Sequence, residues 1–195
     1  MEIYIGNPST GDKAKVTPAG LLKTHSVSES IVEDAAGAGN SFNINTGIIS
    51  LTSASTSAML YFKNNGEEQI HISTIGFLLG NSTGGTGDLV CDVVKNPTAG
   101  TIVSGATDVD INQNKNAGSS KVLTVNAYKG AEALTVTGGE AWYTSLLPGA
   151  GRGYVIATGT LVLTPGSSIG VSITPQTSNT AMSAQVFLSL IKYTL

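Results

Sequence analysis

The residues that could support hydrolytic chemistry are few in this sequence. A nucleophilic hydrolase needs a nucleophile, a general base and an orienting group within hydrogen-bond distance. The sequence has two histidines, His25 and His71, and no Gly-x-Ser-x-Gly motif of the kind that positions a nucleophilic serine. His71 alternates with Ile70 and Ile72, so we expect its ring on the solvent-facing side of a strand. These positions do not favour a Ser-His-acid enzyme.

Paired carboxylates could support glycoside hydrolysis. Asp88 and Asp92 are four residues apart, which puts them on one face of a strand. At about 3.3 Å per residue they lie roughly 13 Å apart, beyond the spacing of either glycosidase geometry. Asp108 and Asp110 are closer in sequence, but their segment is polar and is typical of a solvated loop. An acid pair at an active site is therefore not predicted.

Residues 108–114 resemble the start of a calcium-binding loop, because oxygen ligands occupy alternate positions. That loop needs Gly at its sixth position and Glu at its twelfth, and this sequence has Gln113 and Ser119 there. An incidental cation remains an open alternative for this segment. We assign no catalytic, cofactor-binding or metal-binding residue, and we expect no cofactor.

The sequence contains a single cysteine, Cys91, so it forms no internal disulfide and no multi-cysteine zinc site. Cys91 lies in the apolar run 89–94, a position typical of a small buried side chain rather than of a reactive thiol. A single cysteine without a disulfide partner is typical of a protein made in a reducing cytoplasm.

Aromatic residues give the remaining indication of ligand binding. Exposed Trp and Tyr rings can stack on a sugar face, and Trp142 and Tyr143 are adjacent. On a strand, one of the two rings would point inward and the other outward. We favour a core Trp142 beside a peripheral Tyr143, and keep a sugar platform as the alternative.

The composition indicates an all-β protein. Gly, Ser and Thr supply 68 of the 195 residues, whereas charged residues make up 12%, about half the usual share. Surface helices normally use Glu, Lys and Arg on their wet face, and these residues are scarce here. The net charge of −3 argues against a nucleic-acid partner, and no run of about 18 apolar residues is available to cross a membrane.

Alternating apolar residues predict short strands from residue 42 onward, separated by frequent turns. Asn64-Asn65-Gly66 between two such runs is the strongest hairpin signal in the chain. This spacing is typical of a two-sheet antiparallel sandwich, with a jelly roll as the favoured arrangement. The predicted strands are 42–51 (two short strands or one bulged strand), 58–63, 69–79, 88–95, 109–111, 122–125, 133–136, 142–147, 154–163, 168–173 and 184–193.

The N-terminal region has a different pattern. Residues 1–40 contain frequent turn signals, and residues 21–32 within them are compatible with either a helix or an extended segment. We predict an extended N-terminal arm over residues 1–40 that contacts a partner, and a β-sandwich domain over residues 41–195.

Three stretches resemble small virion structural proteins of tailed bacteriophages: Leu60–Asn64, Lys95–Gly105 and Leu163–Val171. The likeness extends over roughly residues 40–195 and consists of turn-rich strand pairs, without a catalytic signature. It implies a β-sandwich subunit of the capsid or of a head or tail appendage, often a trimer. No site residue is carried over from the resemblance.

Together these features predict a non-enzymatic virion structural protein, made in the host cytoplasm. The favoured function is a capsid decoration or cement protein that binds the major capsid protein or other virion subunits, as a homo-oligomer with a trimer preferred. The alternative is a glycan- or receptor-binding module of a phage head or tail fibre. We expect no nucleic-acid partner and no membrane association.

Overall fold

The computed structural model divides the chain into two compact units, Met1–Ile31 and Val32–Leu195. In the first unit, β1 (Tyr4–Gly6), β2 (Lys13–Val16) and β3 (Leu22–Lys23) form an antiparallel sheet. The predicted partner contact of residues 1–40 stays a prediction. The described residues are 4–6, 13–16, 22–23, 31–52, 55–80, 88–105, 107–109, 113–147, 153–176 and 182–193.

A short helix, α1 (Ile31–Gly37), precedes the strands of the second unit. Glu33 and Asp34 lie in its first turn, where negative charge is favourable to the helix dipole. The helix stops where Gly39 adopts a φ of 73°, and the Asn40 amide then donates to the Ala35 carbonyl at 2.7 Å.

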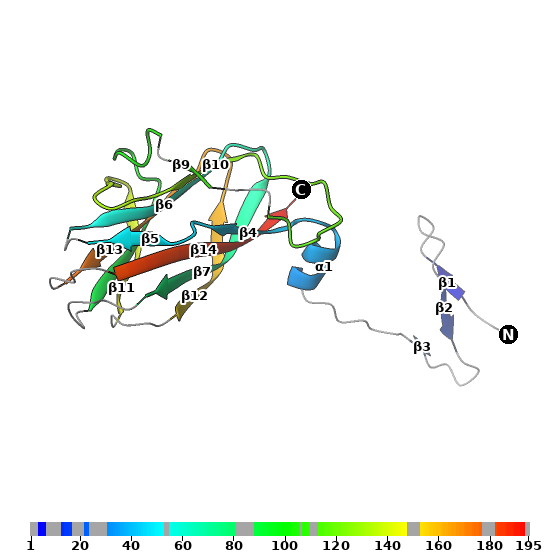
Figure 1. Ribbon diagram of the computed structural model, residues 1–195. Coiled ribbons are helices and arrows are strands. Elements are labelled where there is room, and N and C mark those ends of the chain that lie inside the picture. Colours follow the sequence, from blue (N-terminus) through cyan, green and yellow to red (C-terminus); the bar gives the residue numbers. More distant parts are fainter. Residues whose placement is uncertain are drawn as a thin grey trace. The chain divides into compact units, whose positions relative to one another are not determined.

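The second unit is a sandwich of two antiparallel sheets (Figure 1). One sheet has the strand order β11-β8-β13-β6-β10-β9, and the other has the order β12-β7-β14-β4, with β5 also paired to β14. Its strands are β4 (Ser41–Asn45), β5 (Ile49–Leu51), β6 (Ser57–Asn64), β7 (Gln69–Leu79), β8 (Leu89–Lys95), β9 (Thr107–Asp108), β10 (Val125–Lys129), β11 (Glu140–Leu147), β12 (Gly153–Leu163), β13 (Ser168–Pro175) and β14 (Met182–Tyr193).

Eight of these strands form four nested antiparallel pairs. β8 pairs with β11, β7 with β12, β6 with β13, and β4 with β14. The chain is therefore one long hairpin that folds over on itself, so that successive pairs alternate between the two sheets. This is the strand order of a jelly roll, as the sequence predicted.

The predicted hairpin at Asn64-Asn65-Gly66 is wrong. β6 and β7 lie in different sheets, because β13 and β10 occupy the two edges of β6. Asn64 stabilises the resulting arch by donating from Nδ2 to the carbonyls of Glu68 at 2.8 Å and Leu163 at 3.0 Å. Turn residues reverse the chain, but they do not determine which sheet the next strand joins.

Residues 96–139 form an insert between the paired strands β8 and β11. Within it, β10 pairs with β6 and β9 pairs with β10, so the insert extends one sheet. The strands predicted at 122–125 and 133–136 are largely wrong, since β10 begins at Val125 and residues 133–136 form no strand. Instead, Leu134 and Val136 pack with buried Ile102 against Tyr61 on the outer face of the sheet.

The main hydrophobic core lies between the two sheets. It includes fully buried Phe42 from β4, Phe62 from β6 and Phe77 from β7. β4 and β5 both pair with β14, and Thr46 between them exchanges hydrogen bonds with Val186, each of 3.0 Å. The region 42–51 is thus two short strands along one partner, one of the two alternatives that the sequence left open.

Candidate functional site

Among the described residues, the carboxylates that the sequence analysis considered lie at separate places in the fold. Asp92 lies on β8, where its Oδ1 accepts a hydrogen bond from the Thr144 hydroxyl at 2.7 Å. Asp88 is exposed just before β8, and Asp108 is exposed on β9. Asp110 and His25 lie outside the described residues. Within the ranges that the structure describes, no group of three or more His, Cys, Asp or Glu side chains could hold a metal ion.

His71 projects from the outer face of β7, as the alternation with two buried isoleucines predicted. It is half-buried, and its ring contacts that of Tyr193 with the centroids 4.1 Å apart. Burial lowers the pKa of His71 below its usual 6.5, because the charged ring loses solvation.

Cys91 is fully buried in the core, which confirms the prediction of a small buried side chain. Burial, followed by the neighbouring charge of Asp92, raises the pKa of its thiol to about 12. The thiolate form needed for nucleophilic chemistry is therefore disfavoured near neutral pH.

Trp142 and Tyr143 do not form an exposed platform. Both side chains are half-buried and pack against the main core, with their ring centroids 6.0 Å apart. A bulge between Ala141 and Tyr143 in the pairing of β11 with β8 interrupts the strict alternation of the two rings. Trp142 therefore packs against the core, as expected. Tyr143, which was expected at the periphery, also packs against the core with part of its side chain.

The insert covers the edge strands on one side of the sandwich. β10 occupies the free edge of β6, and residues 113–115 lie along β4. The Asn43 amide donates to the Gln113 carbonyl and the Lys115 amide to the Ser41 carbonyl, each at 2.9 Å. Main-chain groups that would otherwise be unpaired at both edges therefore have partners.

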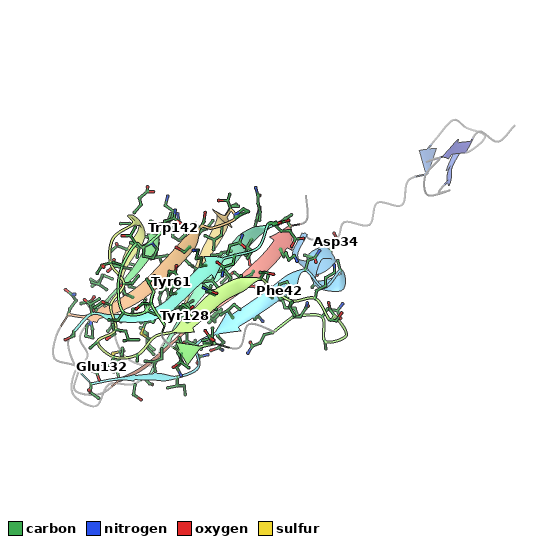
Figure 2. All side chains as sticks on the ribbon, turned by 90° about the horizontal axis from the view of Figure 1, so that it is seen from above. Asp34, Phe42, Tyr61, Tyr128, Glu132 and Trp142 are labelled. Atoms are coloured by element: carbon green, nitrogen blue, oxygen red, sulfur yellow. The ribbon has the colours of Figure 1, made fainter. Side chains whose placement is uncertain are left out.

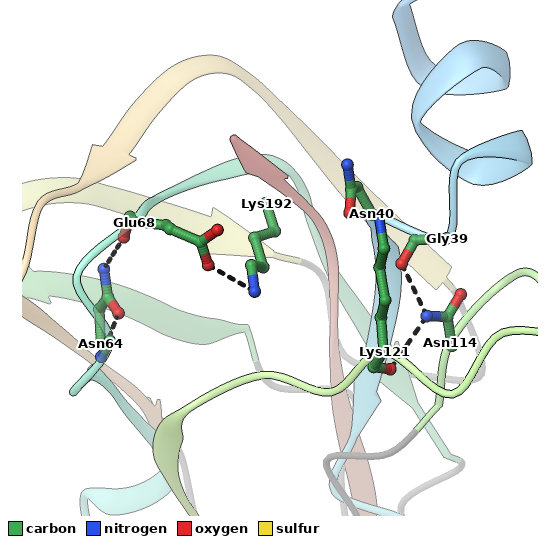
Figure 3. Close-up of polar contacts among 8 residues, drawn as sticks. Gly39, Asn40, Asn64, Glu68, Asn114, Lys121 and Lys192 are labelled. Carbon is green, nitrogen blue, oxygen red and sulfur yellow. Dashed lines mark hydrogen bonds and ion pairs between the residues drawn. The ribbon is translucent and has the colours of Figure 1, made fainter. Parts of the chain in front are cut away.

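The same insert binds the segment that follows α1. Asn114 Nδ2 donates to the Gly39 carbonyl at 2.8 Å, and Asn116 Nδ2 donates to the Gly37 carbonyl at 2.9 Å. Lys121 Nζ donates to Asn40 Oδ1 at 3.0 Å (Figure 3). Residues 37–40 are therefore part of the β-sandwich unit.

On the opposite side of the sandwich, the edge strands are β11 and β12. In the part of the chain that the structure describes, β11 pairs only with β8 and β12 only with β7, so each presents one free edge. β12 is the next strand after β11 in the chain. Leu146 on β11 is 58% exposed, and the Lys95–Glu140 ion pair of 2.9 Å lies at the other end of the strand.

The outer surface of the six-stranded sheet is partly covered. Tyr61 and Tyr128 stack on neighbouring strands, with centroids 5.9 Å apart and planes at 13° (Figure 2). Gly170 leaves room for Val136 of the insert, since a Cβ there would lie 2.5 Å from Val136 Cγ2. The covered region includes β6 and β10, whereas Leu146 on β11 stays in solvent.

The described surface has several hollows. One, of about 450 Å³, lies beside the β6–β7 arch and contains the ion pair between Lys192 and Glu68 (Figure 3). Another, of about 440 Å³, lies on the outer face of β4, β14 and β7 and is lined by Asn43, Ile44, Asn45, Thr74, Gln113, Phe187 and Ser189.

Comparison with known proteins finds only weak structural likenesses. No protein-family model matches the chain, and no curated protein matches it. A chain of the Israeli acute paralysis virus full particle has a TM-score of 0.27 at 11% identity, covering 98% of this chain and 82% of that one. A chain of infectious bursal disease virus, strain Gx, has a TM-score of 0.21 at 12% identity, covering 77% and 29%.

An aminopeptidase from a marine sediment thaumarchaeon has a TM-score of 0.26 at 11% identity, covering 69% of this chain. The chain spans only 25% of that enzyme's length. Two of these three neighbours thus come from virus particles and one is an enzyme. Likenesses of this strength carry no functional argument, so function has to be argued from the chain's own surfaces. Among the described residues, no helix has the length and apolarity to cross a membrane.

Proposed function

We propose that this protein is a non-enzymatic structural subunit of a tailed-phage virion, a capsid decoration or cement protein that assembles as a homotrimer and binds neighbouring shell subunits. The observation that supports this proposal most is the difference between the two sides of the sandwich. One side is covered by β10 and residues 113–115, whereas, among the described residues, β11 and β12 each present a free edge on the other.

Free strand edges pair readily with other chains unless the protein protects them. Among the described residues, β11 is protected by a bulge at Ala141 and an ion pair at Glu140. The exposed Leu146 beyond them adds apolar area that a partner would cover. The centres of protein interfaces are depleted of charged residues, which suits a chain with only 12% charged residues.

We assign the partner-binding arm to the part of the chain before α1. Asn114, Asn116 and Lys121 hold residues 37–40 against the sandwich, so these residues are not free to reach a neighbour. The first unit, Met1–Ile31, has its own sheet and is the segment that would bind the shell. Fold alone does not define this function, because jelly rolls serve capsid proteins and lectins alike.

Binding to shells tests the proposal directly. Shells assembled from the major capsid protein of the same phage are mixed with the full chain and sedimented. We expect the full chain to pellet with the shells and a variant lacking residues 1–30 to stay in the supernatant while keeping the circular dichroism of a β protein. A full chain that never pellets with shells would reject a decoration role.

A matched pair of charge substitutions tests the assembly surface. Leu146→Glu places a charge at the proposed interface, whereas Val122→Glu makes the same change on the insert, where Val122 is 51% exposed. We expect the first variant to dissociate the trimer and the second to leave it intact. Equal behaviour of the two variants would locate the interface elsewhere.

A further inference from the structure

The hollow on the outer face of β4, β14 and β7 has an aromatic floor. Phe187 on β14 is directly opposite Gly76 on β7 in the strand register. A Cβ built at Gly76 would lie 2.0 Å from Phe187 Cζ and 2.1 Å from its Cε1, so the ring occupies the space above the glycine. Phe187 therefore lies across the sheet instead of standing upright, and it remains half-buried.

The rim of this hollow consists of amides and hydroxyls that are available to a ligand. Among the described residues, the side chains of Asn43, Gln113 and Thr74 have no hydrogen-bond partner, although each lines the hollow. Main-chain pairing of Asn43 with Gln113 at 2.9 Å holds the two backbones together. These groups offer both donors and acceptors around one aromatic surface.

Two further groups of the rim are fixed in orientation. Asn45 Oδ1 accepts from Gln185 Nε2 and from the Gly47 amide, each at 2.7 Å, which leaves Asn45 Nδ2 as a donor. Ser189 Oγ accepts from Lys115 Nζ at 2.5 Å, so its hydroxyl proton is free to be donated. Lys115 is thus engaged at the margin, and the described lining residues include no carboxylate.

We propose that this hollow binds a neutral hexose unit of a glycan. The C–H face of a sugar ring would stack on Phe187, and its hydroxyls would exchange hydrogen bonds with Asn43, Asn45 and Gln113. The described lining residues include no carboxylate, and Lys115 is already bonded to Ser189, so this surface suits an uncharged polyol better than a phosphate or an acidic sugar. The site is distinct from Trp142 and Tyr143, which lie on the other sheet.

The test begins with the purified full chain on an array of neutral and acidic glycans, followed by NMR titration with the glycans that bind. We expect neutral hexose-containing glycans to bind with millimolar affinity and to shift the side-chain amide signals of Asn43, Asn45 and Gln113. No binding on the array, binding of acidic glycans alone, or shifts confined to other residues would each overturn the proposal.

Two variants separate ring stacking from folding. Phe187→Leu keeps apolar bulk but removes the aromatic face, and we expect it to weaken glycan affinity roughly tenfold. Because Leu keeps an apolar contact above Gly76, we expect only a small fall in melting temperature. Val122→Ala on the insert is the matched control, because Val122 is 51% exposed and does not line the hollow, and it should bind as the wild type does. Unchanged affinity in Phe187→Leu would reject the stacked ring.

The result of the glycan-binding test does not depend on the proposed role in the virion. Phe187→Leu is expected to leave trimer formation and shell binding unchanged, because Phe187 lies on the five-stranded sheet at β14, an interior strand paired on both sides. Loss of glycan binding with intact shell binding therefore separates the two functions.

Discussion

The ring of Phe187 fills the space that a side chain at Gly76 would occupy on the neighbouring strand. This pairing joins β14 to β7 on the outer face of the five-stranded sheet. A glycine within a strand lacks side-chain packing, and a cross-strand aromatic ring compensates for that loss. The two residues should therefore be energetically coupled.

A double-mutant cycle measures this coupling. Gly76→Ala in the wild type is expected to cost about 1–2 kcal/mol of unfolding free energy, because the new methyl displaces the ring. In a Phe187→Ala background the same change should be neutral or slightly stabilising, since alanine restricts the unfolded chain. Urea unfolding of the four proteins gives the values, and an equal cost in both backgrounds would contradict the coupling.

The arch at Asn64 gives a second prediction. Asn64 is 1% exposed, its Nδ2 donates to two carbonyls, and its Oδ1 accepts from the Gly66 amide at 3.0 Å. Asn64→Ala should cost about 2–3 kcal/mol, because it leaves buried main-chain groups unpaired. The adjacent Asn65 is exposed, so Asn65→Ala is the matched control and should stay within about 0.5 kcal/mol. Similar losses in both would show that the arch does not depend on Asn64.

Asn64 also marks the limit of what the sequence could predict. Apolar alternation located β7, β8, β13 and β14 to within a few residues, because one face of each is buried in the core. The same pattern could not predict which strands pair with one another. The turn at Asn64 has the residues of a hairpin, but the chain crosses to the other sheet, where β7 pairs with β12 and β14, two strands distant from it in sequence.

The candidate glycan site could not be found from sequence for a related reason. Trp142 and Tyr143 attracted attention because they are adjacent, yet both pack against the core. Phe187 and Gly76 are 111 positions apart by their numbers (187 minus 76), and only the register of β14 with β7 brings them together. Sequence patterning reports the face of a residue, whereas a site across strands requires the register.

The packing of the insert gives a third prediction. A Cβ at Gly170 would lie 2.5 Å from Val136 Cγ2 and 3.3 Å from Pro97 Cγ. Gly170→Ala should therefore push residues 131–137 away from β13 and destabilise the protein by about 1–3 kcal/mol. Adding Val136→Ala makes room for the methyl group and should recover part of that loss. Limited proteolysis of the insert, together with urea unfolding, checks both; no recovery in the double variant would contradict the contact.

Cys91 provides a test of burial that depends on pH. Its pKa is raised to about 12 from the usual 9.0, so the folded state binds the thiol proton more tightly than the unfolded state. The associated stability is complete below about pH 9 and is lost as the pH rises toward 12, by up to about 1.4 kcal/mol per pH unit. A Cys91→Ala variant should lack this part of the alkaline loss.

Thiol labelling gives the complementary readout for Cys91. With an aromatic disulfide reagent at pH 8, we expect the native protein to react only as fast as it unfolds, and the urea-unfolded protein to react at once. Rapid labelling of the native protein would show that the core around Cys91 is open to solvent.

The molar mass of the full chain in solution tests the central claim most directly. If the free edges of β11 and β12 and exposed Leu146 form an assembly surface, light scattering at micromolar concentration should give about 59 kDa, three times the 19.8 kDa of one chain. A Leu146→Glu variant should return to the monomer mass. A wild-type chain that stays at 19.8 kDa across the accessible concentrations would contradict the claim.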